Sequence, residues 1–185
     1  MTRSIAEQSS FITILALVIL LLWLPPLHAQ PQTGDHEIEA AGGLFHQQGA
    51  DTGALNLDLS YGYYLTPGWE LGLRQSLNYN FIDDGSDVWT ATTTPFLNYN
   101  FRLTPRILPF LGGFIGVVWN DRDVTGTVGP NAGVKIFLAD QVYFTARYRY
   151  EIFFNKIEAI GDNESDGNHV VNFGLGFVWG GARKP

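Results

Sequence analysis

Residues 55–65 read LNLDLSYGYYL, with apolar and polar residues in alternation. Leucine or tyrosine occupies every second position, and Asn56, Asp58 and Ser60 lie between them. Successive side chains of a β-strand point to opposite faces, so a period of two places these apolar groups on one face. The stretch therefore predicts a strand with one apolar and one polar face.

The same period of two continues along the chain beyond residue 35. At residues 69–82, for example, Trp69 and Leu71 fall on one face and Glu70 and Arg74 on the other. The pattern predicts an all-β fold of eight antiparallel strands. We expect them at about residues 36–47, 53–65, 69–82, 88–103, 107–119, 127–138, 142–155 and 168–179.

The fifth of these stretches, ILPFLGGFIGVVW at 107–119, is apolar on both faces and leaves its register open. Pro109 and Pro130 lack the N–H that a strand donates to its neighbour, so we expect bulges or strand ends near them. Two short repeats, LTP at 65–67 and 103–105 and LNYNF at 77–81 and 97–101, are attributed to convergent composition rather than to gene duplication.

The connections between the expected strands alternate in length, which predicts an up-and-down arrangement. Three are tight, at residues 66–68, 104–106 and 140–141. Four are longer and acidic, around residues 48–52, 83–87, 120–126 and 156–167.

Composition narrows the class of protein. The 185 residues are 45% hydrophobic and include no Cys, which excludes a disordered chain, a disulfide scaffold and Cys-based sites. The net charge of −7 argues against a nucleic-acid partner, because phosphate binding needs a basic surface. Only 16% of the residues are charged, against ~25% in typical soluble domains, which favours an outer surface that does not face water.

Residues 11–24 read FITILALVILLLWL and form an apolar run. A helix of this length spans about 21 Å, whereas a transmembrane helix needs roughly 20 apolar residues. A short apolar run followed by a small residue is typical of a secretory signal peptide. We expect cleavage after Ala29, with an uncleaved membrane anchor as the alternative.

Alternation alone leaves open whether the apolar face of the sheet points into the barrel or away from it, because a soluble lipocalin-type barrel has an apolar interior. Charges of both signs on the polar faces and short turns opposite longer loops favour an outer face in contact with lipid. Aromatic residues near both strand ends favour the same arrangement, since transmembrane barrels carry two aromatic belts. These aromatic residues are Tyr61, Tyr63, Trp69, Tyr99, Phe101, Phe177 and Trp179 at the tight-turn end, and Phe81, Trp89, Trp119 and Phe154 at the other.

The polar faces would then line the lumen. Acids and bases satisfy one another in a confined interior, where an unpaired charge is costly. The expected lumen-lining residues are Glu37, Glu39, Asp58, Glu70, Arg74, Asn78, Asn80, Asn98, Asn100, Arg102, Lys135, Arg147, Arg149 and Glu151.

The chain beyond residue 35 resembles the small bacterial outer-membrane β-barrels of the OmpX and OmpA-transmembrane-domain type. The resemblance rests on the eight alternating strands, the two-ended layout and the last strand, NFGLGFVW at 172–179. It implies an eight-stranded antiparallel up-and-down transmembrane β-barrel in the cell outer membrane. The implied division is a signal peptide at 1–29, a periplasmic lead at 30–35, the barrel at 36–179 and a periplasmic tail at 180–185.

The last strand also resembles the C-terminal assembly signal of that family, with Asn172, Gly174, Phe177 and Trp179 at the signal positions. The tail after Trp179 departs from the family, whose chains usually stop at the terminal aromatic residue. The resemblance implies a monomer whose partners are outer-membrane lipid, lipopolysaccharide and, during insertion, the barrel-assembly machinery.

An eight-stranded barrel has an interior just wide enough to be filled by side chains, which excludes a large open pore. We therefore expect a structural or surface-interaction role for the protein, with its lumen filled by polar and ionic side chains. A narrow porin-like conduit for small solutes is the alternative.

A lipid A-modifying enzyme is a further, less favoured alternative. It is considered because two enzyme families, a lipid A deacylase and a palmitoyl transferase, share this kind of barrel. His46 and His169, with Ser165 nearby in sequence, are the residues that acyl transfer would require. The His-x-Ser arrangement of the deacylase is absent, since Val170 and Val171 follow His169. We expect no catalytic residues and no cofactor.

The segment 162–167, DNESDG, resembles the first half of a calcium loop. Asp162, Glu164 and Asp166 would supply oxygen ligands, but Phe173 occupies the position of the expected bidentate Glu. The sequence thus leaves two interpretations, a weak Ca²⁺ or Mg²⁺ site and a solvated acidic loop. The solvated loop is the favoured one, because only half of the motif is present.

Overall fold

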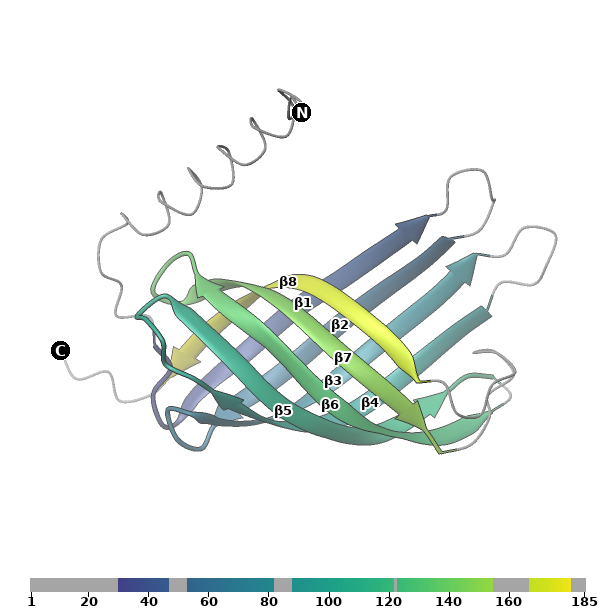
Figure 1. Cartoon of the computed structure of the whole chain (residues 1–185), viewed down its shortest axis with the longest axis horizontal. Coiled ribbons are helices and arrows are strands. Elements are labelled where there is room, and N and C mark those ends of the chain that lie inside the picture. Colours follow the sequence, from purple (N-terminus) through teal and green to yellow (C-terminus); the bar gives the residue numbers. More distant parts are fainter. Residues whose placement is uncertain (1–29, 47–52, 82–87, 122, 155–166, 181–185) are drawn as a thin grey trace, which may run out of the picture.

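Eight antiparallel strands close into a barrel in the computed structural model of the chain, which describes residues 30–46, 53–81, 88–121, 123–154 and 167–180 (Figure 1). No helix in these ranges is long and apolar enough to cross a membrane. The strands are β1 (Asp35–His46), β2 (Gly53–Tyr64), β3 (Trp69–Phe81), β4 (Val88–Asn100), β5 (Ile107–Trp119), β6 (Val124–Phe137), β7 (Val142–Phe153) and β8 (Asn168–Gly180).

Each strand pairs with its neighbours in the sequence, and β1 pairs with β8 to close the sheet. This last pairing runs from Asp35 opposite Gly180 to Gly42 opposite Phe173. Closure leaves the sheet without an edge, so the backbone hydrogen bonds of the wall are made between strands. The all-β, up-and-down barrel expected from the sequence is thereby confirmed.

All eight strands lie within three residues of their expected bounds. The largest differences are at β4, which ends at Asn100, and at β6, which begins at Val124. The β5–β6 connection is correspondingly short, and it is closed by a hydrogen bond from the Asn120 amide to the Asp123 carbonyl (3.0 Å). The expected long loop at residues 120–126 was therefore wrong.

The two prolines lie within strands whose register is unbroken. Pro109 is opposite Val134 near the start of β5, and its carbonyl accepts a hydrogen bond from the Phe101 amide just past the end of β4. Pro130 lies in the middle of β6 opposite Gly113, without a bulge. The missing N–H of Pro130 coincides with a gap in the β6–β7 ladder, so the pairing tolerates it without a shift. The expected bulge near Pro130 was wrong.

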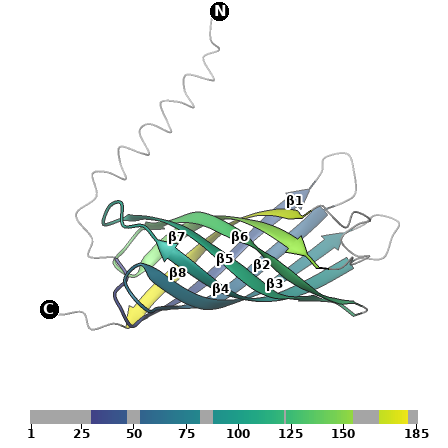
Figure 2. The ribbon, with the colours of Figure 1, turned by 60° about the horizontal axis from the view of Figure 1, so that its bottom comes forward.

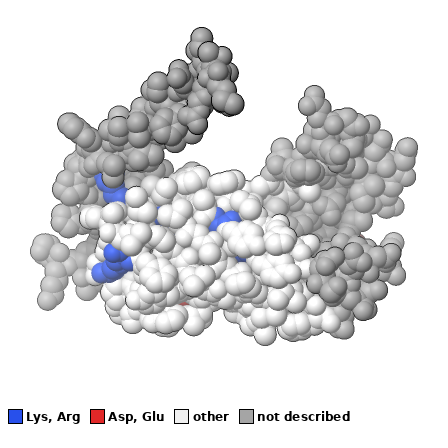
Figure 3. All heavy atoms as spheres, viewed as in Figure 1, with Lys and Arg blue, Asp and Glu red and all other residues white. Residues whose placement is uncertain are grey.

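The barrel wall has an apolar outer face and a largely polar inner face. Figure 3 shows a wall that is almost wholly uncharged in this view. Outward leucines such as Leu57, Leu59 and Leu73 are about half exposed, whereas the inward residues between them are buried. The inner face of β5, which the sequence left open, is Leu108, Phe110, Phe114 and Val118.

Glycines face large side chains across the inner wall. A Cβ atom at Gly133 would lie 2.5 Å from the ring of Phe110, and one at Gly62 would lie 2.7 Å from the carboxylate of Glu70. Gly176 is directly opposite Tyr143, and a Cβ atom there would overlap the tyrosine ring. The small residues thus make room for the side chains that fill the lumen.

The repeated LTP tripeptide has the same function at both of its positions. Thr66 Oγ1 accepts a hydrogen bond from the Trp69 amide (2.9 Å), and Thr104 Oγ1 accepts one from the Ile107 amide (3.0 Å). The threonine hydroxyl therefore closes each turn. These turns lie at the end of the barrel where β8 finishes, on the left of Figure 1 and again in Figure 2.

The packing of Gly176 against Tyr143 leads to a prediction about stability. Gly176→Val should lower the free energy of unfolding by about 1–3 kcal/mol, because the added methyl groups overpack the lumen. Urea unfolding of the refolded barrel, followed by its gel mobility, measures the change. The control is Gly113→Ala on the outer face, where a Cβ atom meets only the Gly129 carbonyl oxygen at 3.6 Å. Equal stability of Gly176→Val and the control would contradict the packing role.

Candidate functional site

A lysine ammonium lies at the centre of a polar cluster that crosses the lumen. Lys135 Nζ on β6 donates hydrogen bonds to both carboxylate oxygens of Glu37 on β1 (2.8 and 2.7 Å) and to Glu70 Oε2 on β3 (2.9 Å). It also contacts Tyr64 Oη on β2 at 3.0 Å, and that hydroxyl donates to Glu37 (2.7 Å). All four side chains are buried, so this Lys135 cluster ties four strands together across the lumen.

A second cluster is built around the carboxylate of Asp58 on β2. Arg149 Nη1 on β7 and Asn172 Nδ2 on β8 each donate a hydrogen bond of 2.5 Å to Asp58 Oδ2. Arg74 Nε on β3 lies 4.0 Å from the same oxygen, and Arg149 Nε lies 3.4 Å from Glu151 Oε1. One acid thus gathers cationic or amide groups from three other strands.

A third ion pair joins β7 to β1. Arg147 Nη2 lies 2.6 Å from Glu39 Oε1, and Tyr143 Oη donates to Glu39 Oε2 at 3.1 Å. The Arg147 guanidinium also lies over the ring of Phe110, 5.6 Å from its centroid. The side of the lumen formed by β5 thus provides aromatic surface against which the cations pack.

Two further cations in the lumen pack against aromatic rings in the same way. Lys135 Nζ lies 5.7 Å from the centroid of Phe110, and the Arg74 guanidinium lies 4.8 Å from that of Phe96. Sequence reasoning expected an ionic and amide lining and missed these rings. For Phe110 the signal was present in the apolar inner positions of 107–119, but a stretch that is apolar on both faces hides it.

Below the Lys135 cluster, towards the tight turns, the lumen contains an apolar cluster. It consists of Leu108, Phe137, Tyr143 and Val178, each at most 1% exposed. The rings of Phe137 and Tyr143 lie 5.4 Å apart. Apolar packing closes this end of the barrel, and ion pairs fill the part above it.

Several buried polar atoms in the described lumen have no hydrogen-bond partner within the protein. They include all three guanidinium nitrogens of Arg74 and both amide atoms of Asn98 and of Asn131. Buried polar groups without a protein partner usually bind ordered water. These positions therefore mark where water would enter the lumen.

The predicted lumen residues have four different outcomes. Glu37, Glu39, Asp58, Glu70, Arg74, Asn98, Asn100, Lys135, Arg147, Arg149 and Glu151 are buried inside the barrel. Asn78 is half-buried and pairs with Asn56, whereas the side chain of Asn80 lies outside the described residues. Arg102 is exposed, so its assignment to the lumen was wrong.

The error at Arg102 follows from the strand end. Because β4 ends at Asn100, Arg102 falls in the turn before β5, and its Nη2 donates to the Pro31 carbonyl (2.6 Å). Asp35, which sequence reasoning did not assign to the lumen, is fully buried and accepts a hydrogen bond from the Gln32 amide (2.7 Å). The described interior therefore holds more acids than bases.

A known family accounts for this architecture. A family model described as "Outer membrane protein beta-barrel domain" matches residues 14–178. The chain belongs to this family. It is therefore a protein of the outer membrane, and its outward apolar face contacts lipid. No curated protein sequence matches the chain.

Solved outer-membrane barrels have a similar fold. The N-terminal β-barrel domain of Pseudomonas aeruginosa OprF is 20% identical, with a TM-score of 0.54 over 80% of this chain and 100% of that one. OprG from the same organism is 15% identical, with a TM-score of 0.55 over 83% and 99%. A de novo designed transmembrane β-barrel is 9% identical, with a TM-score of 0.51 over 81% and 99%.

Aromatic residues form a belt near each end of the outer-membrane barrel. At the tight-turn end Trp69 packs edge-on against Tyr99, with ring centroids 5.0 Å apart. At the other end Trp89 and Trp119 make a similar contact at 5.7 Å. Such belts lie at the two membrane interfaces, where a ring is partly in hydrocarbon and partly in water.

The residues of the expected assembly signal lie along β8. Asn172 points into the lumen, Phe177 is exposed on the outer face, and Gly174 lies between them. The Trp179 ring stacks on Phe177 at 6.0 Å and on His36 of β1 at 5.7 Å. The signal residues thus occupy the seam where the barrel closes.

Most side chains of the less favoured catalytic alternative lie outside the part of the chain that the structure describes. His169 is exposed on the outer face, where its Nδ1 lies 2.7 Å from Tyr148 Oη. The side chain of His46 and all of Ser165 lie outside the described residues, as do Asp162, Glu164 and Asp166 of the half calcium motif. Within the described ranges no group of three or more His, Asp or Glu residues could hold a metal ion.

The Lys135 cluster leads to a prediction about stability. Lys135→Met should lower the free energy of unfolding by about 3–5 kcal/mol, because two buried carboxylates lose their cation. Urea titration of the refolded barrel in lipid vesicles measures the loss. The control is the triple variant Lys135→Met/Glu37→Gln/Glu70→Gln, which removes all three charges and should recover most of the stability. An unchanged urea midpoint for Lys135→Met would contradict the role of the cluster.

Proposed function

We propose that this outer-membrane barrel has a structural or surface-interaction role and that its lumen does not serve as a diffusion pore. The observation that carries the proposal is the Lys135 cluster, whose contacts of 2.7–3.0 Å cross the lumen between four strands. The apolar cluster around Phe137 and Tyr143 adds a second barrier towards the tight turns. The described interior thus offers a solute two successive obstacles.

The surface-interaction role would belong to the connections at the end opposite the tight turns. Their sequences are rich in aspartate, so a partner would carry positive charge or bind through divalent cations. We further propose that Asp162, Glu164 and Asp166 bind Ca²⁺ or Mg²⁺ weakly, with an affinity nearer to ~10⁻⁴–10⁻³ M than to that of a calcium sensor. This part of the proposal is supported by the sequence motif.

We propose no catalytic activity. An acyl-transfer site needs a histidine whose ring reaches a nucleophile and an acid. The contacts of His169 with Tyr148 and Tyr150 support a different role, because they place this histidine within the aromatic belt of the outer face.

Conductance separates a sealed barrel from a narrow conduit. The refolded barrel in a planar bilayer should show no stepwise currents in concentrated KCl. A variant that truncates both obstacles, Glu37→Ala/Glu70→Ala/Lys135→Ala combined with Phe137→Ala/Tyr143→Ala, should show them, because the side chains that cross the lumen and those that fill its tight-turn end are then removed. The observation that supports the alternative, a narrow conduit, is the set of buried polar atoms of Arg74, Asn98 and Asn131 that have no protein partner. Stepwise currents from the unaltered barrel would establish that alternative.

The barrel-assembly machinery is the proposed partner during insertion, and β8 would be the segment that it recognises. Trp179→Asp should reduce the amount of membrane-inserted protein several-fold, because it places a charge at the seam and removes the stacking on His36 and Phe177. Heat-modifiable mobility of the membrane fraction on gels measures the inserted amount. Trp119→Asp, in the opposite aromatic belt, is the control for the charge alone. Normal insertion of Trp179→Asp would overturn the assignment.

A further inference from the structure

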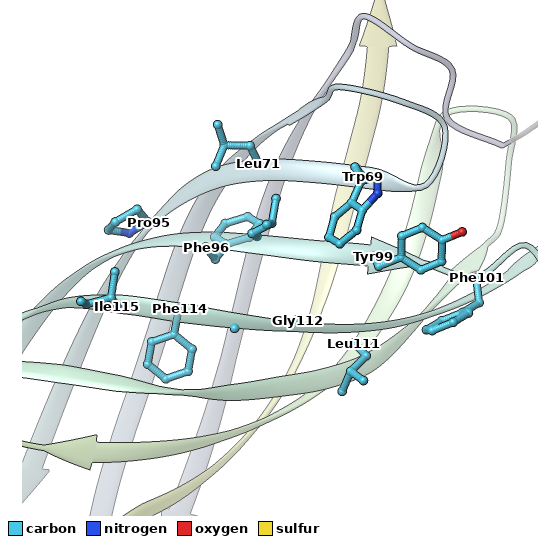
Figure 4. A pocket seen from close by; sticks show the side chains of 12 residues that line it. Trp69, Leu71, Pro95, Phe96, Tyr99, Phe101, Leu111, Gly112, Phe114 and Ile115 are labelled. Carbon is cyan, nitrogen blue, oxygen red and sulfur yellow. The ribbon is translucent and has the colours of Figure 1, made fainter.

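The outer face of the barrel is hollowed over β3, β4 and β5. The groove has a volume of about 700 Å³ and is lined almost entirely by apolar side chains (Figure 4). Its floor is Gly113, which points outward opposite Leu97. A Cβ atom at Gly113 would meet only the Gly129 carbonyl oxygen, at 3.6 Å, so the space above this residue is open. Leu111 and Ile115 stand on either side of it along β5.

One end of the groove is aromatic. Trp69, Tyr99 and Phe101 follow one another there, as Figure 4 shows, and successive ring centroids are 5.0 Å apart. This is the tight-turn end of the barrel, where the aromatic belt marks the membrane interface. The groove therefore runs from the hydrocarbon region to the interface of one leaflet.

Two arginines lie just beyond the aromatic end. Arg102 and Arg106 belong to the turn that joins β4 to β5, the same strands that form most of the groove. Within the ranges that the structure describes, they are the only Lys or Arg residues outside the lumen. Figure 3 shows basic groups near this end of the barrel. Arg102 is exposed and donates a hydrogen bond from Nη2 to the Pro31 carbonyl (2.6 Å), and Arg106 is half-buried.

We propose that the groove, together with Arg102 and Arg106, binds one anionic phospholipid of the leaflet at the tight-turn end. An acyl chain would lie over Gly113 between Leu97, Leu111 and Ile115, and the phosphate would lie against the two guanidinium groups. The groove faces the hydrocarbon of the bilayer, where an acyl chain is already in apolar surroundings. Moving that chain into the groove therefore gains little from burial alone. The advantage comes from charge and from the fit of the chain.

Charge also favours a lipid over a second copy of the barrel. Two barrels that met through this groove around a twofold axis would bring their Arg102 and Arg106 turns near each other, and like charges would repel. A phosphate placed between the arginines is attracted instead. A cation near a membrane surface strengthens anionic-lipid binding by about fivefold, so both arginines together predict about 25-fold.

Native mass spectrometry of the refolded full-length barrel tests the proposal. The barrel is released from micelles that contain equal amounts of phosphatidylglycerol and phosphatidylcholine with identical acyl chains. We expect one phosphatidylglycerol to be retained about 25-fold over phosphatidylcholine. Arg102→Gln, which keeps an N–H donor for Pro31, should lower this preference by about fivefold. Gly113→Leu should lower the retention of both lipids, because its side chain fills the groove.

The matched control is Ala40→Leu, which adds the same side chain to the outer face on β1, away from the groove. It should leave lipid retention unchanged, and gel mobility verifies that each variant is folded. Equal retention of the two lipids by the unaltered barrel would overturn the proposal, as would equal losses from Gly113→Leu and Ala40→Leu. A dimer mass that Gly113→Leu abolishes would identify the groove as a barrel–barrel interface instead. If Gly113→Leu does not fold, the Arg102→Gln result decides the question alone.

Discussion

The hydrocarbon core of a membrane offers no water to hydrogen-bond the backbone, so each backbone N–H and C=O of the wall must find its partner within the protein. A sheet satisfies this constraint only when it has no edge, and the pairing of β1 with β8 removes the last two edges. Closure also gives each strand one side towards lipid and one towards the lumen, so the alternation of side chains along a strand becomes an alternation of apolar and polar residues. The half-exposed leucines of β2 and the buried acids between them follow from this geometry.

Closure also determines what the lumen must contain. Charged groups enclosed by the wall are stable only when they find partners, and here the partners come from strands distant in sequence. Lys135 meets Glu37 across 98 residues of chain, and Arg149 meets Asp58 across 91. Glycines opposite Phe110 and Tyr143 then provide the space that these large side chains occupy. The lumen is therefore a core of ion pairs and rings, in which polar contacts link strands that the backbone ladder does not join.

Much of this architecture could be predicted from the sequence, because alternation reports directly on the two environments of the wall. Strand positions and most inward charges followed from it, including Arg147 and Arg149 of β7.

Prediction failed where alternation carries no information. The stretch 107–119 is apolar on both faces, so Phe110 and Phe114 were not recognised as lumen residues. Arg102 continues the alternation of β4 past the end of its ladder, and only the turn after Asn100 shows that it lies outside. The inward charges of β7 predicted pairing with acids such as Asp58, Glu70 or Glu151. Arg149 does pair with Asp58 and Glu151, whereas Arg147 pairs with Glu39, because spacing within a strand does not say which distant residue faces it.

The outer face carries a different kind of information. A wall whose only task is to contact fluid lipid needs apolar side chains of any shape, so an outward glycine at mid-strand is unexpected there. Gly113 leaves a groove there. Aromatic side chains line one end of this groove, and the basic turn between β4 and β5 follows them, so its two ends differ in chemistry. The lumen and the outer face therefore make separate contributions. The Lys135 cluster links four strands across the lumen, whereas the groove over β3, β4 and β5 distinguishes one part of the lipid contact from the rest. Selective interaction with the surrounding membrane does not require that the lumen carry a solute.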